Sequence, residues 1–168
     1  MVLAYVGLSL IGVLAFWLAG MGLFDSINHT MSAIATGGFS TSDRSLGNWS
    51  QPAIHWVAVV LMILGSLPFV LYVSVLRGNY KALLRDQQVR GFIGILLLIW
   101  LVLGSWYALT TQLHWLEAVR HVAVNTTSII STTGFALGDY TLWGGFAGML
   151  FFYIGFVGGC SGSTAGGL

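Results

Sequence analysis

Long stretches of this chain contain no charged side chain. Asp, Glu, Lys and Arg are absent from residues 1–24, 53–76 and 91–111, and from every position after Asp139. Only 7% of the residues are charged and 57% are hydrophobic, whereas a water-facing domain carries about 25% charged residues. Since about 20 apolar residues suffice for a helix to cross a bilayer, we expect an all-α integral membrane protein with several spans.

A short segment rich in glycine and hydroxyl groups occurs twice between these runs. One copy covers residues 35–43 and the other covers residues 131–139, 96 residues later. Irregular backbone is tolerated at membrane depth only where protein surrounds it or where it lines a cavity. We therefore interpret both segments as re-entrant filter loops of a cation channel or transporter. Four residue types coincide, at Thr36/Thr132, Gly38/Gly134, Phe39/Phe135 and Asp43/Asp139.

Helical runs of two lengths surround these loops. Pro52 suits the first position of a helix, where its missing amide is not needed, and Pro68 is expected to kink the helix that contains it. The half-length helices are predicted over residues 27–35 and 117–131. The full spans are predicted over residues 1–24, 53–76, 91–111 and 142–157.

The order of span, half-length helix, loop and broken span occurs twice. With the loops superposed, residues 65–68 fall on residues 161–164, so both second spans are expected to break at the same depth. Asp25 and Glu117 are only 92 residues apart, so the second half-length helix is expected to be about one turn longer. We predict two tandem span–pore-helix–span (M1-P-M2) repeats, a partial voltage-gated-like ion channel fold. The repeats cover residues 1–76 and 91–168, the second truncated in its last helix, and residues 77–90 form a linker.

The linker carries the highest density of positive charge in the chain, with a net charge of +3 over residues 77–90. Short basic loops between spans stay on the cytoplasmic side. The other two loop regions each carry a net charge of −1, which places both filter loops on the outer side. A linker folded as an amphipathic helix on the inner surface would leave this orientation unchanged.

The filter loops have the composition that potassium coordination needs. Carbonyl oxygens of converging loops replace the hydration shell of K⁺. Glycine permits the backbone turns that aim successive carbonyls at one axis, and Gly38 and Gly134 are expected to need this freedom. The carbonyls predicted to coordinate K⁺ belong to Thr36, Gly37, Gly38, Thr132, Thr133 and Gly134.

Two further pairs of residues accompany the loops. Phe39 and Phe135 are expected to wedge each loop against the surrounding helices. Asp43 and Asp139 follow the loops, where carboxylates at an outer mouth would raise the local cation concentration. Asp is equally at home as a turn or cap residue, and both interpretations stay open.

Two histidines lie near the starts of the half-length helices. His29 and His121 each follow an acidic residue, Asp25 or Glu117, by four positions. Ionisable groups inside a membrane are often functional, so a metal-handling protein or membrane enzyme is the alternative to transport. Because no cluster of Cys or Glu accompanies them, we favour buried structural histidines, and we predict no enzyme activity and no cofactor.

The end of the chain is too rich in glycine for a regular helix. A phosphate-binding loop is excluded because the expected Lys is absent. One remaining interpretation of this segment is a helix-packing motif that uses Gly155 and Gly159. We favour a flexible intramembrane gate below the second filter loop. It is formed by Gly158, Gly159, Cys160, Ser161, Gly162, Ser163, Thr164, Ala165, Gly166 and Gly167.

Residues 35–43, 131–135 and 158–167 together resemble the Trk/Ktr/HKT superfamily of cation transporters, and the Gly-Gly-Cys form is most similar to its bacterial TrkH/TrkG branch. The resemblance covers nearly the whole chain. It implies potassium uptake across the bacterial inner membrane by a subunit of four repeats, of which this chain resembles the second and third. Gly38 and Gly134, rather than Ser, are similar to potassium-selective members.

The same resemblance implies partners. These are the lipid bilayer, a homodimeric arrangement, and a TrkA-like nucleotide-binding regulator on the cytoplasmic side. Two of the four repeats are missing, so we expect a fragment of a larger transporter. Two copies of the chain are the other source of four loops, and a non-functional fragment of a larger transporter is a further alternative to transport. Passive passage of K⁺ and symport with H⁺ or Na⁺ both stay open. No basic run is dense enough to indicate nucleic-acid binding.

Overall fold

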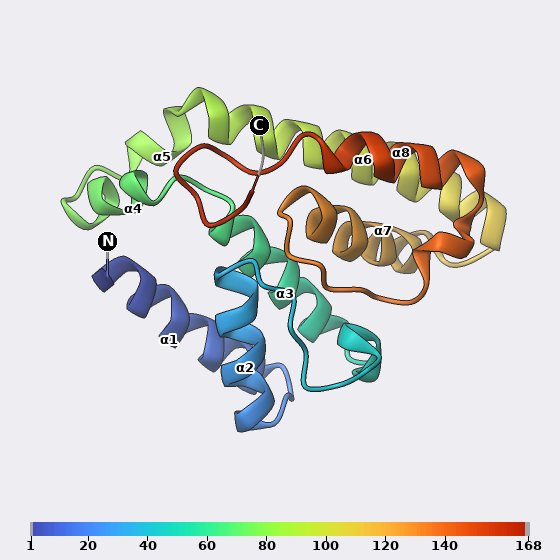
Figure 1. The fold of residues 1–168 in the computed structure, drawn as a ribbon, viewed down its shortest axis with the longest axis horizontal. Helices are drawn as coiled ribbons and strands as arrows, with labels where there is room; N and C mark the ends of the chain where they lie inside the picture. Colours follow the sequence, from blue (N-terminus) through green and yellow to red (C-terminus); the bar gives the residue numbers. More distant parts are fainter. Residues whose placement is uncertain (1, 167–168) are drawn as a thin grey trace.

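The computed structural model describes residues 2–166 as helices joined by loops, with no strand among these residues (Figure 1). The all-helical expectation is confirmed. The helices are α1 (Val2–Leu18), α2 (Leu23–Ile34), α3 (Pro52–Gly65), α4 (Phe69–Leu76), α5 (Lys81–Arg85), α6 (Gln87–Thr111), α7 (Trp115–Ile130) and α8 (Gly145–Gly155), with 3-10 turns η1 (Ser45–Asn48) and η2 (Tyr140–Trp143).

Helix α3 runs through the middle of the molecule and contacts both half-length helices, α2 and α7 (Figure 1). Helix α1 packs along α2, and α6 packs along α7. After α8 the chain returns to the start of α4, where the amide of Phe69 donates to the carbonyl of Gly162 (3.0 Å). The end of the chain after α8 therefore contacts the start of α4 in its first half.

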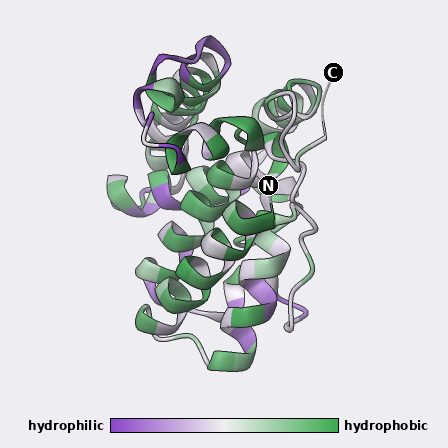
Figure 2. Cartoon of the chain, turned by 90° about the vertical axis from the view of Figure 1, so that its left-hand side faces the viewer, coloured by the Kyte–Doolittle hydropathy of each residue, from purple (hydrophilic) through white to green (hydrophobic). Residues whose placement is uncertain are grey.

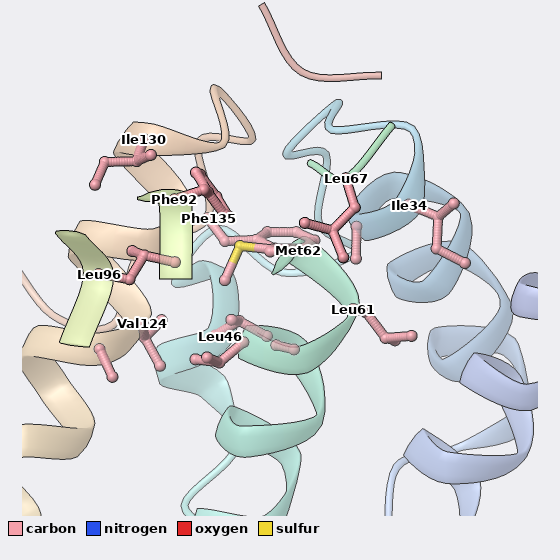
Figure 3. Packing of buried hydrophobic residues seen from close by; sticks show 14 of the residues in the cluster. Ile34, Leu46, Leu61, Met62, Leu67, Phe92, Leu96, Val124, Ile130 and Phe135 are labelled. Atoms are coloured by element: carbon pink, nitrogen blue, oxygen red, sulfur yellow. The ribbon is translucent and has the colours of Figure 1, made fainter. Parts of the chain in front are cut away.

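The buried core joins the two half-length helices through α3. Met62 of α3 lies at its centre, with Val124 and Ile130 of α7 on one side and Ile34 of α2 on the other (Figure 3). All four side chains are fully buried. Burying a side chain of this size contributes roughly 1.5–3 kcal/mol. The core therefore fixes the two half-length helices relative to each other.

Large apolar side chains are exposed on several helices, and most of the helical ribbon is coloured hydrophobic in Figure 2. Leu10 and Leu18 of α1, Leu101 of α6 and Phe152 of α8 are each more than half exposed. Soluble monomers rarely expose contiguous apolar patches larger than a few hundred Å². These faces suit lipid or further membrane helices.

Two of the four predicted spans, the first and the fourth, are shorter in the structure than expected. Among residues 2–166, α6 with 25 residues is the one helix long and apolar enough to cross a membrane. Helices α3 and α4 qualify only as a pair, bent by 93° at their break. Helix α1 has 17 residues and α8 has 11, so both are shorter than predicted over residues 1–24 and 142–157, whereas the bend in the second span was expected at Pro68.

The first span ends six residues before its predicted end at position 24. The amide of Met21 donates to the carbonyl of Phe16 (3.1 Å), and Gly20 adopts a φ of 100°. This pairing is the usual way in which a helix ends at a glycine. Helix α2 consequently begins at Leu23, and Asp25 lies in its first turn rather than before it.

Several other boundaries agree with the sequence. Pro52 is the first residue of α3, and the chain bends between Gly65 and Phe69, where Pro68 precedes α4. Helix α2 has 12 residues and α7 has 16. The predicted difference of about one turn is confirmed.

The two second spans do not break at matched positions. Helix α3 ends at Gly65, whereas α8 ends at Gly155, ahead of position 161 where the offset places the break. The Gly-rich run stops α8 early because glycine disfavours helix, while α3 continues almost to Pro68. The two breaks nevertheless lie against each other, since the amide of Cys160 donates to the carbonyl of Ser66 (3.0 Å).

We expect Gly65→Ala to lower the melting temperature of the chain in detergent. A Cβ at Gly65 would lie 2.8 Å from the carbonyl oxygen of Ile34, and overpacking of this kind costs about 1–3 kcal/mol. The matched control is Gly94→Ala in α6, where a Cβ meets nothing within 4 Å and helix propensity favours Ala. Equal melting temperatures for the two variants would contradict this packing.

Candidate functional site

The half-length helices α2 and α7 end in the same left-handed turn. The residue after each helix cap is a threonine with positive φ, 51° at Thr36 and 54° at Thr132. The next amide donates to the carbonyl five residues earlier, at 2.8 Å from Gly37 and 2.9 Å from Thr133. This closure usually places glycine at the left-handed position, and a non-glycine residue there costs roughly 1–2 kcal/mol. This conformational cost occurs twice, at two threonines that are 96 residues apart.

The two candidate filter loops, residues 35–43 and 131–139, touch through their backbones. Gly38 and Gly134 both have positive φ, 70° and 93°. A Cβ on Gly38 would collide with the carbonyl oxygen of Thr133 and would lie 3.1 Å from Cα of Gly134. The close approach therefore requires glycine at position 38. It brings together the loops that contain the predicted potassium ligands Thr36, Gly37, Gly38, Thr132, Thr133 and Gly134.

The electrostatics of the two helix ends favour a cation. Helices α2 and α7 direct their carboxyl ends at the candidate filter loops, and neither has a basic residue in its last turn. A helix carries the equivalent of roughly half a negative charge at that end. The two partial negative charges therefore face the segment where the loops meet, without a nearby cation on either helix end.

The two loop phenylalanines differ in their packing. Phe135 is 1% exposed, and its ring stacks on the imidazole of His29 with 5.6 Å between ring centroids. Phe39 is 83% exposed, so the expectation that it wedges its loop is wrong within the described residues. The reason is that Phe135 packs on the half-length helix of the other repeat, whereas Phe39 has no such helix on its side among residues 2–166.

His29 is fully buried, and both of its ring nitrogens are engaged. Nδ1 lies 2.9 Å from the carbonyl oxygen of Asp25, and Nε2 lies 2.9 Å from the hydroxyl of Ser40. Because a carbonyl only accepts, Nδ1 donates and Nε2 accepts from Ser40. His29 thus ties the first loop to α2 through Ser40, which is a structural role.

The counterpart of His29 in α7 is Asn125 rather than His121. Asn125 is fully buried; its Nδ2 donates to the carbonyl of Leu137 (3.0 Å), and its Oδ1 accepts from the Leu137 amide (2.9 Å). It ties the second loop to α7 through Leu137. Asn125 was not predicted as a site residue, although it lies at the offset of 96 from His29.

Asp43 and Asp139 line the same cavity. Both are exposed and line a space of about 630 Å³ together with His121 and Arg44. Asp139 also accepts a hydrogen bond from the Thr141 amide (3.0 Å) and so caps η2. Across residues 2–166, no group of three or more His, Cys, Asp or Glu is placed to hold a metal ion.

The Gly-rich loop, residues 158–167, is irregular over its described part, residues 158–166. Gly167 lies outside the described residues. Gly159 lies beyond the end of α8 at Gly155, so the alternative of helix packing through these two glycines is wrong. The loop closes on itself where the Gly159 amide donates to the Gly166 carbonyl (2.9 Å). It reaches the end of α2, where the Thr164 hydroxyl donates to the Ile34 carbonyl (2.6 Å).

Comparisons with known proteins agree with one another. The chain matches the TrkH family, described as cation transport proteins, over residues 1–168. It is 45% identical to the Trk system potassium uptake protein TrkI of Halomonas elongata over 98% of this chain and 33% of that protein. It is 35% identical to TrkH of Vibrio parahaemolyticus over 98% of this chain and 35% of that protein.

The fold agrees with a solved structure as well. The crystal structure of the potassium transporter TrkH from Vibrio parahaemolyticus matches with a TM-score of 0.87 at 35% identity, over 96% of this chain and 36% of that one. The chain therefore spans about a third of the length of the relatives it matches.

The two phenylalanines give a matched pair of variants. We expect Phe135→Ala to destabilise the 168-residue chain by about 3–5 kcal/mol, the usual cost of removing a buried aromatic ring. Phe39→Ala removes an exposed ring and should leave stability nearly unchanged. Denaturant unfolding in detergent followed by tryptophan fluorescence measures both. Equal losses for the two variants would show that the difference in burial is absent in solution.

Proposed function

This chain belongs to the TrkH family of cation transport proteins, and we propose that it forms part of a pathway for potassium uptake across a bilayer. Its relatives include Trk system potassium uptake proteins. Because the chain spans about a third of their length, the transport activity is proposed for the protein to which this chain contributes. The observation that carries the proposal is the backbone contact between the two candidate filter loops at Gly38 and Thr133.

In this proposal the loops coordinate a dehydrated ion. Carbonyl oxygens of residues 36–38 and 132–134 replace part of the hydration shell of K⁺. The matched positive φ angles at Thr36 and Thr132, and again at Gly38 and Gly134, support an equivalent path for both loops. The carboxyl ends of α2 and α7 add a favourable field for a cation.

We propose that the chain consists of two M1-P-M2 repeats. Helices α1, α2 and the bent pair α3–α4 form the first repeat, over residues 1–76. Helices α6, α7 and α8 belong to the second, over residues 91–168. Helices α2 and α7 start 92 residues apart and end 96 residues apart, which supports duplication with one extra turn in α7. Residues 77–90 form the cytoplasmic linker, which places both loops on the outer side.

Further filter loops complete the pore. The exposed ring of Phe39 supports this step, because the equivalent Phe135 is buried against the half-length helix of the other repeat. The missing loops come from remaining repeats of the same subunit or from a second copy. The assembly is a multi-pass protein of the bacterial inner membrane, homodimeric and regulated by a TrkA-like nucleotide-binding partner. Asp43 and Asp139 lie at its outer mouth.

The Gly-rich loop is proposed as the gate of this pathway. Its contacts with the end of α2 and with the second loop, through Thr164 and Gly166, support a position across the inner side of the filter. The alternative of a metal-handling protein or enzyme is less favoured, because His29 uses both ring nitrogens in structural hydrogen bonds.

Substituting the two loop glycines tests the function. We expect Gly38→Ser and Gly134→Ser to lower the preference for K⁺ over Na⁺, because positive φ strains any residue with a Cβ. The loss should be larger at Gly38, where the Cβ also meets the Thr133 carbonyl. A distortion worth 1.4 kcal/mol corresponds to about a tenfold change in preference.

The measurement is K⁺ and Na⁺ uptake by bacteria deficient in their own potassium uptake, with the protein expressed from its complete natural reading frame. Gly94→Ala in α6 is the matched control, since its Cβ meets no neighbour within 4 Å. Wild-type ion preference in both serine variants would overturn the proposed filter.

A further inference from the structure

The two left-handed threonines contact the same loop. The hydroxyl of Thr36 lies within hydrogen-bond distance of the carbonyl oxygen of Thr164 (2.8 Å) and also of that of Ala35 (2.8 Å). The hydroxyl of Thr132 accepts from the amide of Gly166 (2.8 Å). Thr36 and Thr132 are matched positions of the two candidate filter loops, yet their partners lie two residues apart in the Gly-rich loop. Both loops are therefore hydrogen-bonded to one short segment.

Thr164 joins three parts of the molecule. Its hydroxyl lies within hydrogen-bond distance of the carbonyl of Ile34 (2.6 Å), at the end of α2, and of the carbonyl of Gly65 (2.8 Å), at the end of α3. Its amide also donates to Gly65 (3.2 Å). The last four carbonyls of a helix have no partner within that helix. Thr164 supplies such a partner to both α2 and α3.

Polar contacts, rather than apolar burial, hold this segment. Ser161, Gly162, Thr164 and Gly166 are exposed, and Cys160 is the one member of the buried hydrophobic cluster among residues 158–166. A loop with so little apolar area gains little from the hydrophobic effect. Its position therefore depends on hydrogen bonds. Those of Thr36, Thr132 and Thr164 act together with the backbone bonds from Phe69 to Gly162 and from Cys160 to Ser66.

We propose that Thr164 is a positioning residue for the first filter loop, and that the hydroxyls of Thr36 and Thr132 latch the Gly-rich loop between the two filter loops. This rests on the proposed function of residues 35–43 and 131–139 as filters. The Gly-rich loop leaves only by breaking hydrogen bonds to both of them. Release of the Gly-rich loop and loosening of the filter are then one event.

Cys160 reports whether the loop is released. It is the single cysteine of this chain, it is 7% exposed, and its amide is bonded to Ser66. We would treat membranes containing the protein, expressed from its complete natural reading frame, with N-ethylmaleimide. Mass spectrometry of the peptide that carries Cys160 then gives the rate of modification. This rate follows the population of the released state when opening is fast.

Each valine variant removes one hydroxyl, and its serine counterpart keeps it. A hydrogen bond of ordinary strength corresponds to about a fivefold change in an equilibrium. Thr36→Val should therefore raise the rate of Cys160 modification about fivefold. Thr164→Val removes the one hydroxyl proton that the Ile34 and Gly65 carbonyls share, and should also raise it about fivefold. Thr36→Ser and Thr164→Ser should stay within about twofold of wild type.

Ion preference is measured on the same variants. The proposal expects K⁺ over Na⁺ preference to fall in the order in which Cys160 modification rises. Thr132→Val changes a residue outside the Gly-rich loop, so it tests the latch even if Thr164→Val fails to fold. Monodispersity in detergent checks the folding of each variant. Wild-type Cys160 reactivity in all three valine variants overturns the latch. Raised reactivity with unchanged ion preference overturns the coupling.

The failure of the proposed function gives a different result. If the wild-type protein carries no K⁺, the transport proposal falls, while the Cys160 comparison between valine and serine variants still decides whether the threonines latch the loop.

Discussion

A left-handed turn at a threonine ends each half-length helix, and the rest of the site depends on it. The turn sends the backbone away from the axis of α2 or α7 and into the segment where the candidate filter loops meet. Threonine is disfavoured in that conformation by roughly 1–2 kcal/mol. Part of this cost is offset by the two hydrogen bonds of the helix closure and by the bond from each threonine to the Gly-rich loop. Glycine would remove both the strain and the hydroxyl that makes that bond.

The half-length helices suit a position inside protein rather than in lipid. Their buried faces are polar, with Thr30 in α2 and Asn125 and Thr126 in α7 fully enclosed. Enclosed polar groups are tolerated when they are hydrogen-bonded. Asn125 and Thr126 both are, whereas the Thr30 hydroxyl has no partner among the described residues. The apolar side chains face outward on α1, α6 and α8 instead. Two short polar helices within an apolar frame give the backbone of the loops a protected environment.

The sequence predicted those features that local chemistry determines. The offset of 96 located both loops, Pro52 located the start of α3, and the spacing of Asp25 and Glu117 anticipated the extra turn of α7. The early end of α1 was also readable, since Gly20 is a typical helix stop, but the charge-free run concealed it. Whether a helix ends inside an apolar run depends on one backbone angle rather than on hydropathy.

Features that depend on distant contacts were not readable. Phe39 and Phe135 occupy matched sequence positions, and their difference in burial arises from which helix stands beside each ring. The contact between Thr36 and Thr164 joins residues 128 positions apart, and no local pattern marks it. Asn125, by contrast, could have been found from the sequence at the offset of 96 from His29, but the matched spacing of His121 from Glu117 pointed to the histidine instead.

The most direct test is an experimental structure of the protein, expressed from its complete natural reading frame and prepared in Tl⁺, a heavy stand-in for K⁺. Our account predicts ion density bounded by the carbonyl oxygens of residues 36–38 and 132–134, on an axis that both loops share. Loops that face lipid or bulk water, with no ion density between Gly38 and Gly134, would contradict it.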